Sequence, residues 1–307
     1  MTNLSSIEIV DVTARDGLQN EATLFSTQDK IDLINRAIEA GAKRIEVASF
    51  VHPKYVPQMA DAEAVIQGLP KHDDVKYIGL VMNERGVERA LKTHIDELGF
   101  VAVASDSFAK ANQNQTRQGS VDMACELMQR AIAEGRSANV TIGAAFGCPF
   151  EGETLIETIV DMCRQFGQAG PREIAIADTI GVGNPWHVKA LIEAIRDILP
   201  DMPLRAHFHN TRNTGLANVY AAIEAGISTL DVSIGGIGGC PFAPAATGNV
   251  PSEDVVYMLE RHGIETGMSL DKIIETAQWL SQKMDKPLPG MVSRAGGFPK
   301  NLNHAAE

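Results

Sequence analysis

The sequence predicts a (β/α)8 TIM barrel over residues 1–280, followed by an irregular C-terminal extension over residues 281–307. Eight short apolar runs rich in β-branched residues recur along the chain, with segments of helical periodicity between them. Strands that alternate with helices pair in parallel through right-handed crossovers, and eight of them match a barrel closed on itself. The main alternative, a doubly wound open sheet, lacks its glycine fingerprint, because TARDGLQNE follows the first strand instead.

Local patterns predict the individual elements. The helical segment STQDKIDLINRAIEAG begins with a Ser26/Asp29 capping box, and NPWHVKALIEAIRDIL has Pro185 at its first helical position after a capping Asn184. After Leu280 the chain has several prolines and glycines but no periodicity, so we expect this tail to wrap the barrel or to be mobile. The eight candidate strands are residues 7–12, 44–50, 76–82, 100–105, 140–146, 173–178, 204–209 and 229–234.

The composition excludes several classes of partner. The 307 residues are 44% hydrophobic and 21% charged, as in an ordinary soluble globular protein. The 39 acidic and 27 basic residues give a formal net charge of −12, and no basic block interrupts the sequence. Nucleic acid and anionic membranes are therefore poor partners, and an anionic substrate needs a local basic pocket.

The cysteine pattern indicates a reducing compartment. The four cysteines Cys125, Cys148, Cys163 and Cys240 are scattered without a CxxC pair, so we interpret all of them as thiols. The N-terminal segment has no basic or long apolar leader, and the C-terminal NHAAE is no targeting tripeptide. We expect a cytoplasmic protein.

Polar residues gather at the C-terminal ends of the predicted strands, where barrels of this type carry their chemistry. The first strand is followed by a cluster, and later strands each contribute one or two residues. These candidates are Arg15, Asp16, Gln19, Glu46, Asp178, His207, His209 and Asn249.

His207 and His209 are two residues apart in a predicted strand, so both rings project from the same face. Asp16 and Asn249 add a carboxylate oxygen and an amide oxygen, which leaves positions for water or substrate. This mixed set suits Mg²⁺, Mn²⁺ or another borderline divalent ion better than a closed zinc site. The alternative is a hydrogen-bonded histidine pair in the barrel interior.

Arg15 at a strand end is a candidate to stabilise an oxyanion or enolate oxygen through directed donors, the alternative being a salt bridge at a helix flank. Glu46 is expected at the barrel mouth, where it pairs with Arg15 or Lys43.

The glycine-rich segment GGIGGCPFAPAATGN is expected to be a mobile loop that delivers Cys240 as an acid/base thiol, the alternative being a buried, unreactive cysteine. The other GCP, at residues 147–149, is interpreted as structural.

Several motifs in order give the chain a family resemblance. It resembles the 3-hydroxy-3-methylglutaryl-CoA lyase family, which belongs to the metal-dependent TIM-barrel lyases and Claisen condensing enzymes. Each motif alone is weak, but the ordered set spans most of the chain and is highly specific. The motifs are RDGLQNE (15–21), IEVASFVHPKYVPQM (45–59), GCPFEG (147–152), DTIGVG (178–183), HFH (207–209), GGIGGCPFAPAATGN (235–249) and EDVVYMLE (253–260).

The resemblance implies cleavage of a 3-hydroxyacyl-CoA into acetyl-CoA and a keto acid, which is acetoacetate for the parent substrate. It implies a divalent cofactor, Mg²⁺ or Mn²⁺, no organic cofactor, and a homodimer formed near residues 252–263. Asp16, His207, His209 and Asn249 match the metal ligands, Arg15 the enolate-stabilising arginine, Cys240 the protonating cysteine, and Glu46 and Asp178 acidic residues needed for activity. His207 or Asp178 is the candidate base for the hydroxyl proton.

The sequence departs from the family pattern beside the candidate ligands. The family's H-C-H-D-T-Y-G is replaced by HFHNTRNTG, which puts Asn210 and Arg212 next to the histidines. Arg212 is a candidate to bind a substrate carboxylate or the CoA phosphates, and Gln19 and Ser105 are the other substrate-binding candidates. Ala144 and Ala145 stand where relatives carry a serine and a cysteine, and VTA (12–14) replaces V-G-P. Hydroxyl donors are lost and space is gained, so a bulkier or differently branched substrate stays open.

Two other functions compete with the lyase. One is a condensing synthase that joins acetyl-CoA to a 2-oxo acid, although the Cys240 loop and the length of 307 residues favour the lyase. The other is a catalytically idle barrel that binds an acyl-CoA or a metal. An idle barrel predicts that a ligand or acid is missing, and none is missing here.

Overall fold

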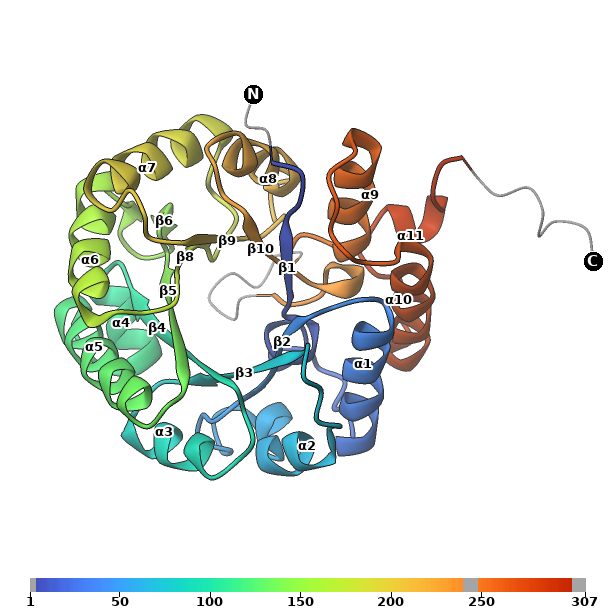
Figure 1. The fold of residues 1–307 in the computed structure, drawn as a ribbon, viewed down its shortest axis with the longest axis horizontal. Helices are drawn as coiled ribbons and strands as arrows, with labels where there is room; N and C mark the ends of the chain where they lie inside the picture. The colour runs from blue at the N-terminus through green and yellow to red at the C-terminus, as the bar shows by residue number, and fades with distance from the viewer. Residues whose placement is uncertain (1–3, 240–247, 300–307) are drawn as a thin grey trace, which may run out of the picture.

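Eight parallel strands close a barrel in the order β1-β10-β9-β8-β5-β4-β3-β2 (Figure 1). The computed structural model describes residues 4–239 and 248–299. Within these, the fold is the predicted (β/α)8 TIM barrel. The barrel strands are β1 (Glu8–Asp11), β2 (Arg44–Ser49), β3 (Lys76–Val81), β4 (Glu97–Val103), β5 (Ser137–Gly143), β8 (Ile174–Asp178), β9 (Leu204–Phe208) and β10 (Thr229–Val232).

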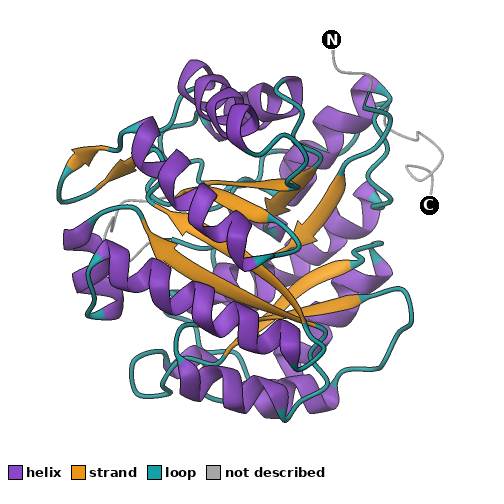
Figure 2. Cartoon of the chain, turned by 60° about the vertical axis from the view of Figure 1, so that its left-hand side comes forward, coloured by secondary structure: helices purple, strands orange, loops and turns teal. Residues whose placement is uncertain are grey.

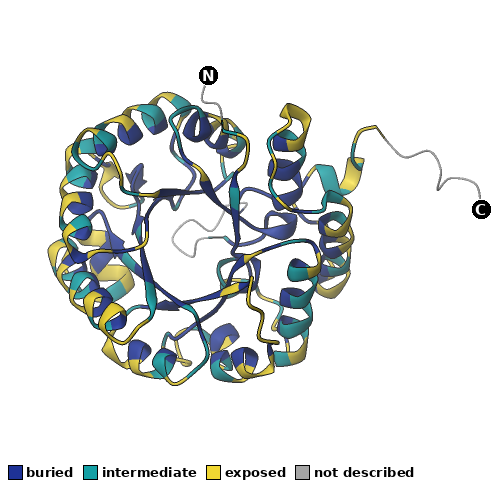
Figure 3. Cartoon of the chain, viewed as in Figure 1, coloured by how far each residue is buried: buried dark blue, intermediate teal, exposed yellow. Residues whose placement is uncertain are grey.

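Helices surround the strands on the outside, as the turned view shows (Figure 2). Their inner faces and the strands are buried, whereas their outer faces are exposed (Figure 3). The helices are α1 (Thr27–Glu39), α2 (Ala62–Gly68), α3 (Glu84–Leu91), α4 (Asp106–Gln113), α5 (Arg117–Ala133), α6 (Ile156–Ala169), α7 (Pro185–Ile198), α8 (Gly215–Glu224), α9 (Ser252–His262), α10 (Leu270–Met284) and α11 (Val292–Ala295). Shorter pieces are the π-helix η1 (Thr13–Gly17), the 3₁₀ helices η2 (Pro57–Met59) and η3 (Ile234–Gly236), and a small hairpin of β6 (Gly147–Cys148) and β7 (Gly152–Glu153).

The predicted helix starts are confirmed. The Ser26 hydroxyl accepts from the Asp29 N–H at 3.1 Å, and Asp29 accepts from the Ser26 N–H, which completes the capping box of α1. Asn184 caps α7 by accepting from the His187 N–H at 3.1 Å, and Pro185 is the first helical residue.

Two strands begin earlier than predicted. β4 starts at Glu97 rather than residue 100, and β5 at Ser137 rather than residue 140. The sequence pattern missed these starts because polar residues, Glu97, Ser137 and Asn139, interrupt the apolar run there. Glu97 lies inside the barrel, where the Arg44 guanidinium lies 2.7 Å from its carboxylate. A charged side chain is accepted in a buried strand when it is paired.

The C-terminal extension is more regular than expected. α10 continues to Met284, so the predicted boundary at residue 280 falls inside a helix, and α11 follows. Leu288 is buried, and the Gly290 N–H donates to the Gly235 carbonyl at 3.1 Å. The extension up to residue 299 therefore packs on the barrel beside η3. Among the described residues, no helix is both long and apolar enough to cross a membrane.

Candidate active site

A cavity of about 170 Å³ lies at the C-terminal ends of the barrel strands, where the sequence predicted the chemistry. One part of its lining is apolar and the other part is polar. The apolar part comes from β3, β4 and α4 and includes Leu80, Met82, Val101, Val103 and Phe108. The polar part includes Arg15, Asp16, Gln19, Asn20, Glu46, Arg205, His207, His209 and Asp231.

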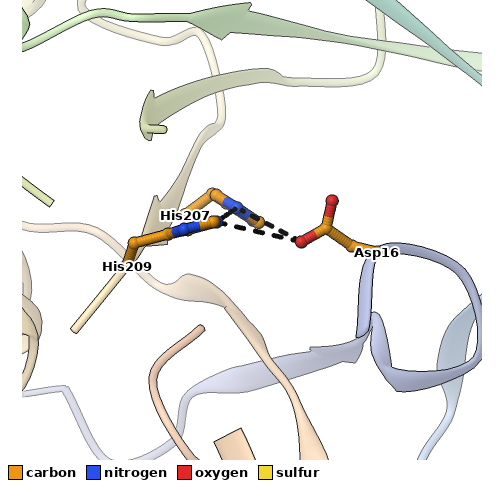
Figure 4. A group of neighbouring side chains, drawn as sticks. All are labelled: Asp16, His207 and His209. Atoms are coloured by element: carbon orange, nitrogen blue, oxygen red, sulfur yellow. Dashed lines mark hydrogen bonds and ion pairs between the residues drawn. The ribbon is translucent and has the colours of Figure 1, made fainter. Parts of the chain in front are cut away.

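Asp16, His207 and His209 converge in this cavity (Figure 4). The Nε2 atoms of the two histidines lie 3.1 Å apart, and each lies 3.9 Å from Asp16 Oδ2. Donor atoms held about 2.1 Å from one ion are about 3.0 Å apart at right angles and about 4.2 Å apart when opposite. The observed separations are therefore compatible with three donors around a single ion.

Asn249 reaches the cluster through its backbone as well as its side chain. His209 and Asn249 form an antiparallel bridge, so the end of the glycine-rich loop pairs with the end of β9. The Asn249 Nδ2 donates to Asp16 Oδ2 at 2.8 Å and to the Ile237 carbonyl at 3.0 Å. A Cβ on Gly238 would lie 2.4 Å from this Nδ2, so only glycine allows the loop to approach so closely.

The charges in the cluster favour an ionised carboxylate beside a neutral histidine. Burial opposes the charge on Asp16, but Arg15, His207 and His209 outweigh it and lower the pKa of Asp16 from 3.8 to about 2. Burial, helped by the charge of His207, lowers the pKa of His209 to about 4. For His207 burial acts in the same direction, but Asp231 and Asp16 prevail and raise its pKa.

Arg15 is fixed between two carboxylates. Its Nη1 donates to Asp16 Oδ1 at 2.8 Å, and its Nη2 lies 2.6 Å from Glu46 Oε2. Of the two predicted partners of Glu46, Arg15 is the one observed, because Lys43 pairs with Asp74 at the surface. This arrangement brings the predicted guanidinium into the cavity.

Gln19 also lines the cavity, and its Oε1 is buried without a hydrogen-bond partner in the described part of the chain. The neighbouring Asn20 donates from Nδ2 to the Gly239 carbonyl at 2.8 Å, which ties the loop after β1 to the glycine-rich loop. Cys240, the predicted acid, lies outside the described residues.

Asp178 and Arg212 do not line the cavity. The two oxygens of Asp178 accept from the N–H groups of Val182 and Gly183, both at 2.9 Å. The Arg212 guanidinium donates to the carbonyls of Ile180 and Gly181 at 2.9 and 3.0 Å. Both side chains therefore hold the loop between β8 and α7.

Ser105 and the two alanines also lie outside the cavity lining. The Ser105 hydroxyl donates to Cys148 Sγ at 2.9 Å and caps α4. Ala144 and Ala145 are fully buried, and Gly143 is the residue that lines the cavity at this strand end. The two alanines therefore add no space to this cavity, contrary to the expectation.

The sequence interpretation missed Arg205 and Asp231. Asp231 lies opposite His207 in the β9–β10 register, and its Oδ2 is 3.0 Å from His207 Nδ1. A signal was present, because Asp231 is a lone carboxylate in the apolar run TLDVSI, and Arg205 lies two residues before His207 on the same strand face.

The chain as a whole is similar to several known lyases. Residues 6–280 match the model of the HMGL-like family. The (R)-citramalyl-CoA lyase of Chloroflexus aurantiacus is 39% identical over 95% of this chain and 96% of its own. The hydroxymethylglutaryl-CoA lyase of Bacillus subtilis is 39% identical over 92% and 95%. An HMG-CoA lyase structure from Acinetobacter baumannii, in complex with coenzyme A and 3-methylmalate, superposes with a TM-score of 0.92 at 38% identity over 98% of both chains.

Proposed function

This chain belongs to the HMGL-like family and is a carbon–carbon lyase, and we propose that it cleaves 3-hydroxy-3-methylglutaryl-CoA to acetyl-CoA and acetoacetate. The observation that carries the proposal is the convergence of Asp16, His207 and His209 beside Arg15 in one cavity. In this reaction the C3 hydroxyl loses its proton and the C2–C3 bond breaks. Its electron pair becomes the thioester enolate, and a proton is then added at C2.

The residues present fit a divalent ion, Mg²⁺ or Mn²⁺, held by Asp16, His207, His209 and Asn249. The donors are hard oxygen and borderline nitrogen, and the His207 Nδ1 is engaged by Asp231, so its Nε2 faces the other donors. Asn249 would have to turn its amide oxygen toward the ion, since its nitrogen faces Asp16. When bound, the ion supplies Lewis-acid polarisation of the substrate's hydroxyl and carboxylate oxygens.

Arg15 is proposed to stabilise the enolate oxygen. Its guanidinium is oriented by Asp16 and Glu46 before the substrate binds, and such fixed donors are most effective where charge develops in the transition state. Gln19, with its buried Oε1, is proposed to contact the substrate.

The reaction needs two proton transfers, one from the C3 hydroxyl and one to the enolate carbon. Cys240 is proposed, from the family resemblance, to protonate the enolate carbon. Of the two candidate bases, His207 cannot both bind the ion through Nε2 and accept the hydroxyl proton, because its Nδ1 already holds the proton shared with Asp231. Both oxygens of Asp178 accept loop N–H groups, and Asp178 does not line the cavity. We therefore favour a positioning role for Asp178 over a direct one.

Citramalyl-CoA is the second candidate substrate, favoured by the 39% identity to the lyase named for it. It has one methylene fewer than the methylglutaryl compound between the carbinol carbon and the carboxylate. A pocket distinguishes substrates that differ by one methylene by about 10- to 200-fold. The ratio of the two kcat/KM values therefore assigns the substrate.

A coupled assay for free acetyl-CoA tests the proposal. It uses the methylglutaryl compound, both enantiomers of citramalyl-CoA and longer 3-hydroxyacyl-CoAs, with Mg²⁺ or Mn²⁺ and with EDTA as control. We expect metal-dependent cleavage of the methylglutaryl compound with the highest kcat/KM. A higher kcat/KM for another compound would make that compound the assigned substrate. Inactivity on all of them would contradict the proposal.

The ligand assignment has a separate test. Asp16→Ala is expected to abolish stoichiometric metal binding, as measured by calorimetry, and retention of one bound ion per chain would refute the ligand assignment.

We also propose a cytoplasmic homodimer with contacts near residues 252–263. Light scattering coupled to gel filtration measures the mass, and a monomer of 33.0 kDa would exclude the dimer.

A further inference from the structure

Asp231 contacts the ring nitrogen of His207 that faces away from the other candidate ligands. Asp231 belongs to β10, is 6% exposed, and places its Oδ2 3.0 Å from His207 Nδ1. An ionised carboxylate only accepts hydrogen bonds, so the shared proton belongs to Nδ1. The lone pair of His207 is then on Nε2, which points toward His209 and Asp16.

Asp231 also forms a buried ion pair with Arg205. The Arg205 Nε lies 3.3 Å from Asp231 Oδ1, and its Nη1 lies 3.2 Å from Glu173 Oε1. Its Nη2 donates to Asn139 Oδ1 at 3.0 Å. The contact with Asp231 is an ion pair without a hydrogen bond, since neither Arg205 Nε nor Asp231 Oδ1 has a hydrogen-bond partner among the described residues. The buried guanidinium therefore favours the ionised carboxylate of Asp231 beside His207 through its charge.

The second histidine has no such support. The Nδ1 of His209 is buried and has no hydrogen-bond partner within residues 4–239 and 248–299. The two histidines therefore differ, since one is oriented by a carboxylate and the other by its backbone bridge to Asn249.

We propose that Asp231 is a positioning residue for the reaction, which keeps His207 in the Nδ1-protonated tautomer so that its Nε2 is presented to the divalent ion. This inference rests on the proposed function for the metal-binding role of His207. Histidines that bind metals commonly donate their other N–H to a carboxylate, and loss of that carboxylate typically weakens metal affinity about 10- to 100-fold.

Asp231→Asn tests the proposal, with Asp11→Asn as matched control. Asp11 is also a buried carboxylate, on the neighbouring strand β1, but its hydrogen bonds come from Thr13 and it does not line the cavity. Mn²⁺ affinity is measured by electron paramagnetic resonance of the free ion, on variants whose folding is checked by circular dichroism. We expect the Kd to rise about 10- to 100-fold in Asp231→Asn and to be unchanged in Asp11→Asn.

A second readout does not depend on metal. Nitrogen-15 NMR of histidine-labelled, metal-free protein, recorded at a pH above the raised pKa of His207, reports the tautomer of each neutral ring, and a His207→Gln spectrum identifies the signal of His207. We expect Nδ1-protonated His207 in the wild type and a shift toward the other tautomer in Asp231→Asn. If Asp231 only neutralised Arg205, its substitution would lower stability but leave the tautomer and the Kd unchanged.

The outcomes separate the inference from the proposed function. A wild-type protein that binds no Mn²⁺ would contradict the proposed metal role, while the tautomer would still test Asp231. A wild-type His207 protonated mainly on Nε2 would overturn the inference even if Asp231→Asn failed to fold. Equal Mn²⁺ affinities in the wild type and Asp231→Asn would also overturn it.

Discussion

Arg15 shows how single residues prepare this site. Its guanidinium bridges two carboxylates, those of Asp16 and Glu46, at 2.8 and 2.6 Å. A guanidinium offers a rigid planar fork of donors, so two partners fix its direction as well as its position. Donors that need no reorientation during the reaction contribute most to stabilising the developing charge.

Arg15→Lys keeps the positive charge of the side chain but replaces the planar set of guanidinium donors with a single ammonium group. We expect kcat to fall about 10²- to 10³-fold, because the ammonium group cannot hold both carboxylates and the enolate oxygen together. Steady-state kinetics measure this, with Mn²⁺ affinity as the control that the ligands are intact. A kcat close to that of the wild type would show that Arg15 does not stabilise the transition state.

His209→Ala and Cys240→Ala are expected to separate the ligand and acid roles. The first removes a donor from the cluster, so both metal binding and turnover should be lost. The second should reduce turnover strongly while metal binding, measured by calorimetry, stays intact. Unchanged turnover in Cys240→Ala would refute the acid role, and full metal occupancy in His209→Ala would refute the ligand role.

Between elements, carboxylates and guanidiniums tie the loops of the active face together. Asp178 and Arg212 both hold the loop after β8, although the sequence suggested direct roles in the reaction. Glu253, at the start of α9, accepts from the Gly235 N–H at 3.0 Å and so connects that helix to η3. Burial raises the pKa of Glu253 from 4.5 to about 7.

Glu253→Gln is expected to remove a pH dependence of stability. The folded-state pKa of Glu253 lies above its unfolded value of 4.5, so the folded state binds more protons between pH 4.5 and about 7. The stabilisation of the folded state by this proton uptake at Glu253 is therefore fully present below pH 4.5 and is lost as the pH rises toward 7. Relative to the variant, the wild-type free energy of unfolding should fall by up to about 1.4 kcal/mol per pH unit in this window. Urea unfolding at several pH values measures this difference, and a constant difference would contradict the assignment.

Across the whole molecule, a column of charges fills the barrel interior. Arg44 is 2% exposed and contacts Glu97 at 2.7 Å and Glu173 at 2.6 Å. Glu173 also contacts Arg205, and Arg205 in turn contacts Asp231, the residue beside His207. The column therefore extends from the N-terminal end of the strands to the candidate ligands.

Arg44→Met is expected to destabilise the fold by about 3–5 kcal/mol, because it leaves buried carboxylates without their cation. Chemical denaturation measures the loss. The control is Lys43→Met, since Lys43 and Asp74 form an exposed pair that should contribute nothing measurable. If both substitutions had the same small effect, the column would not be a source of stability.

The sequence by itself determined the barrel and the core of the candidate site. Apolar runs and capping residues are local signals, so the eight strands and the starts of α1 and α7 followed from them. The spacing of His207 and His209 was equally informative, because alternation along a strand places both rings on one face.

Tertiary structure alone decided which polar side chains reach the cavity. The register between β9 and β10 sets Asp231 beside His207, and closure of the barrel brings Arg44 to Glu97 and Glu173. Arg212 turns to the carbonyls of its neighbouring loop instead of the cavity. Such pairings join residues far apart in sequence, and their geometry depends on the packing of the whole barrel, so no local pattern contains it.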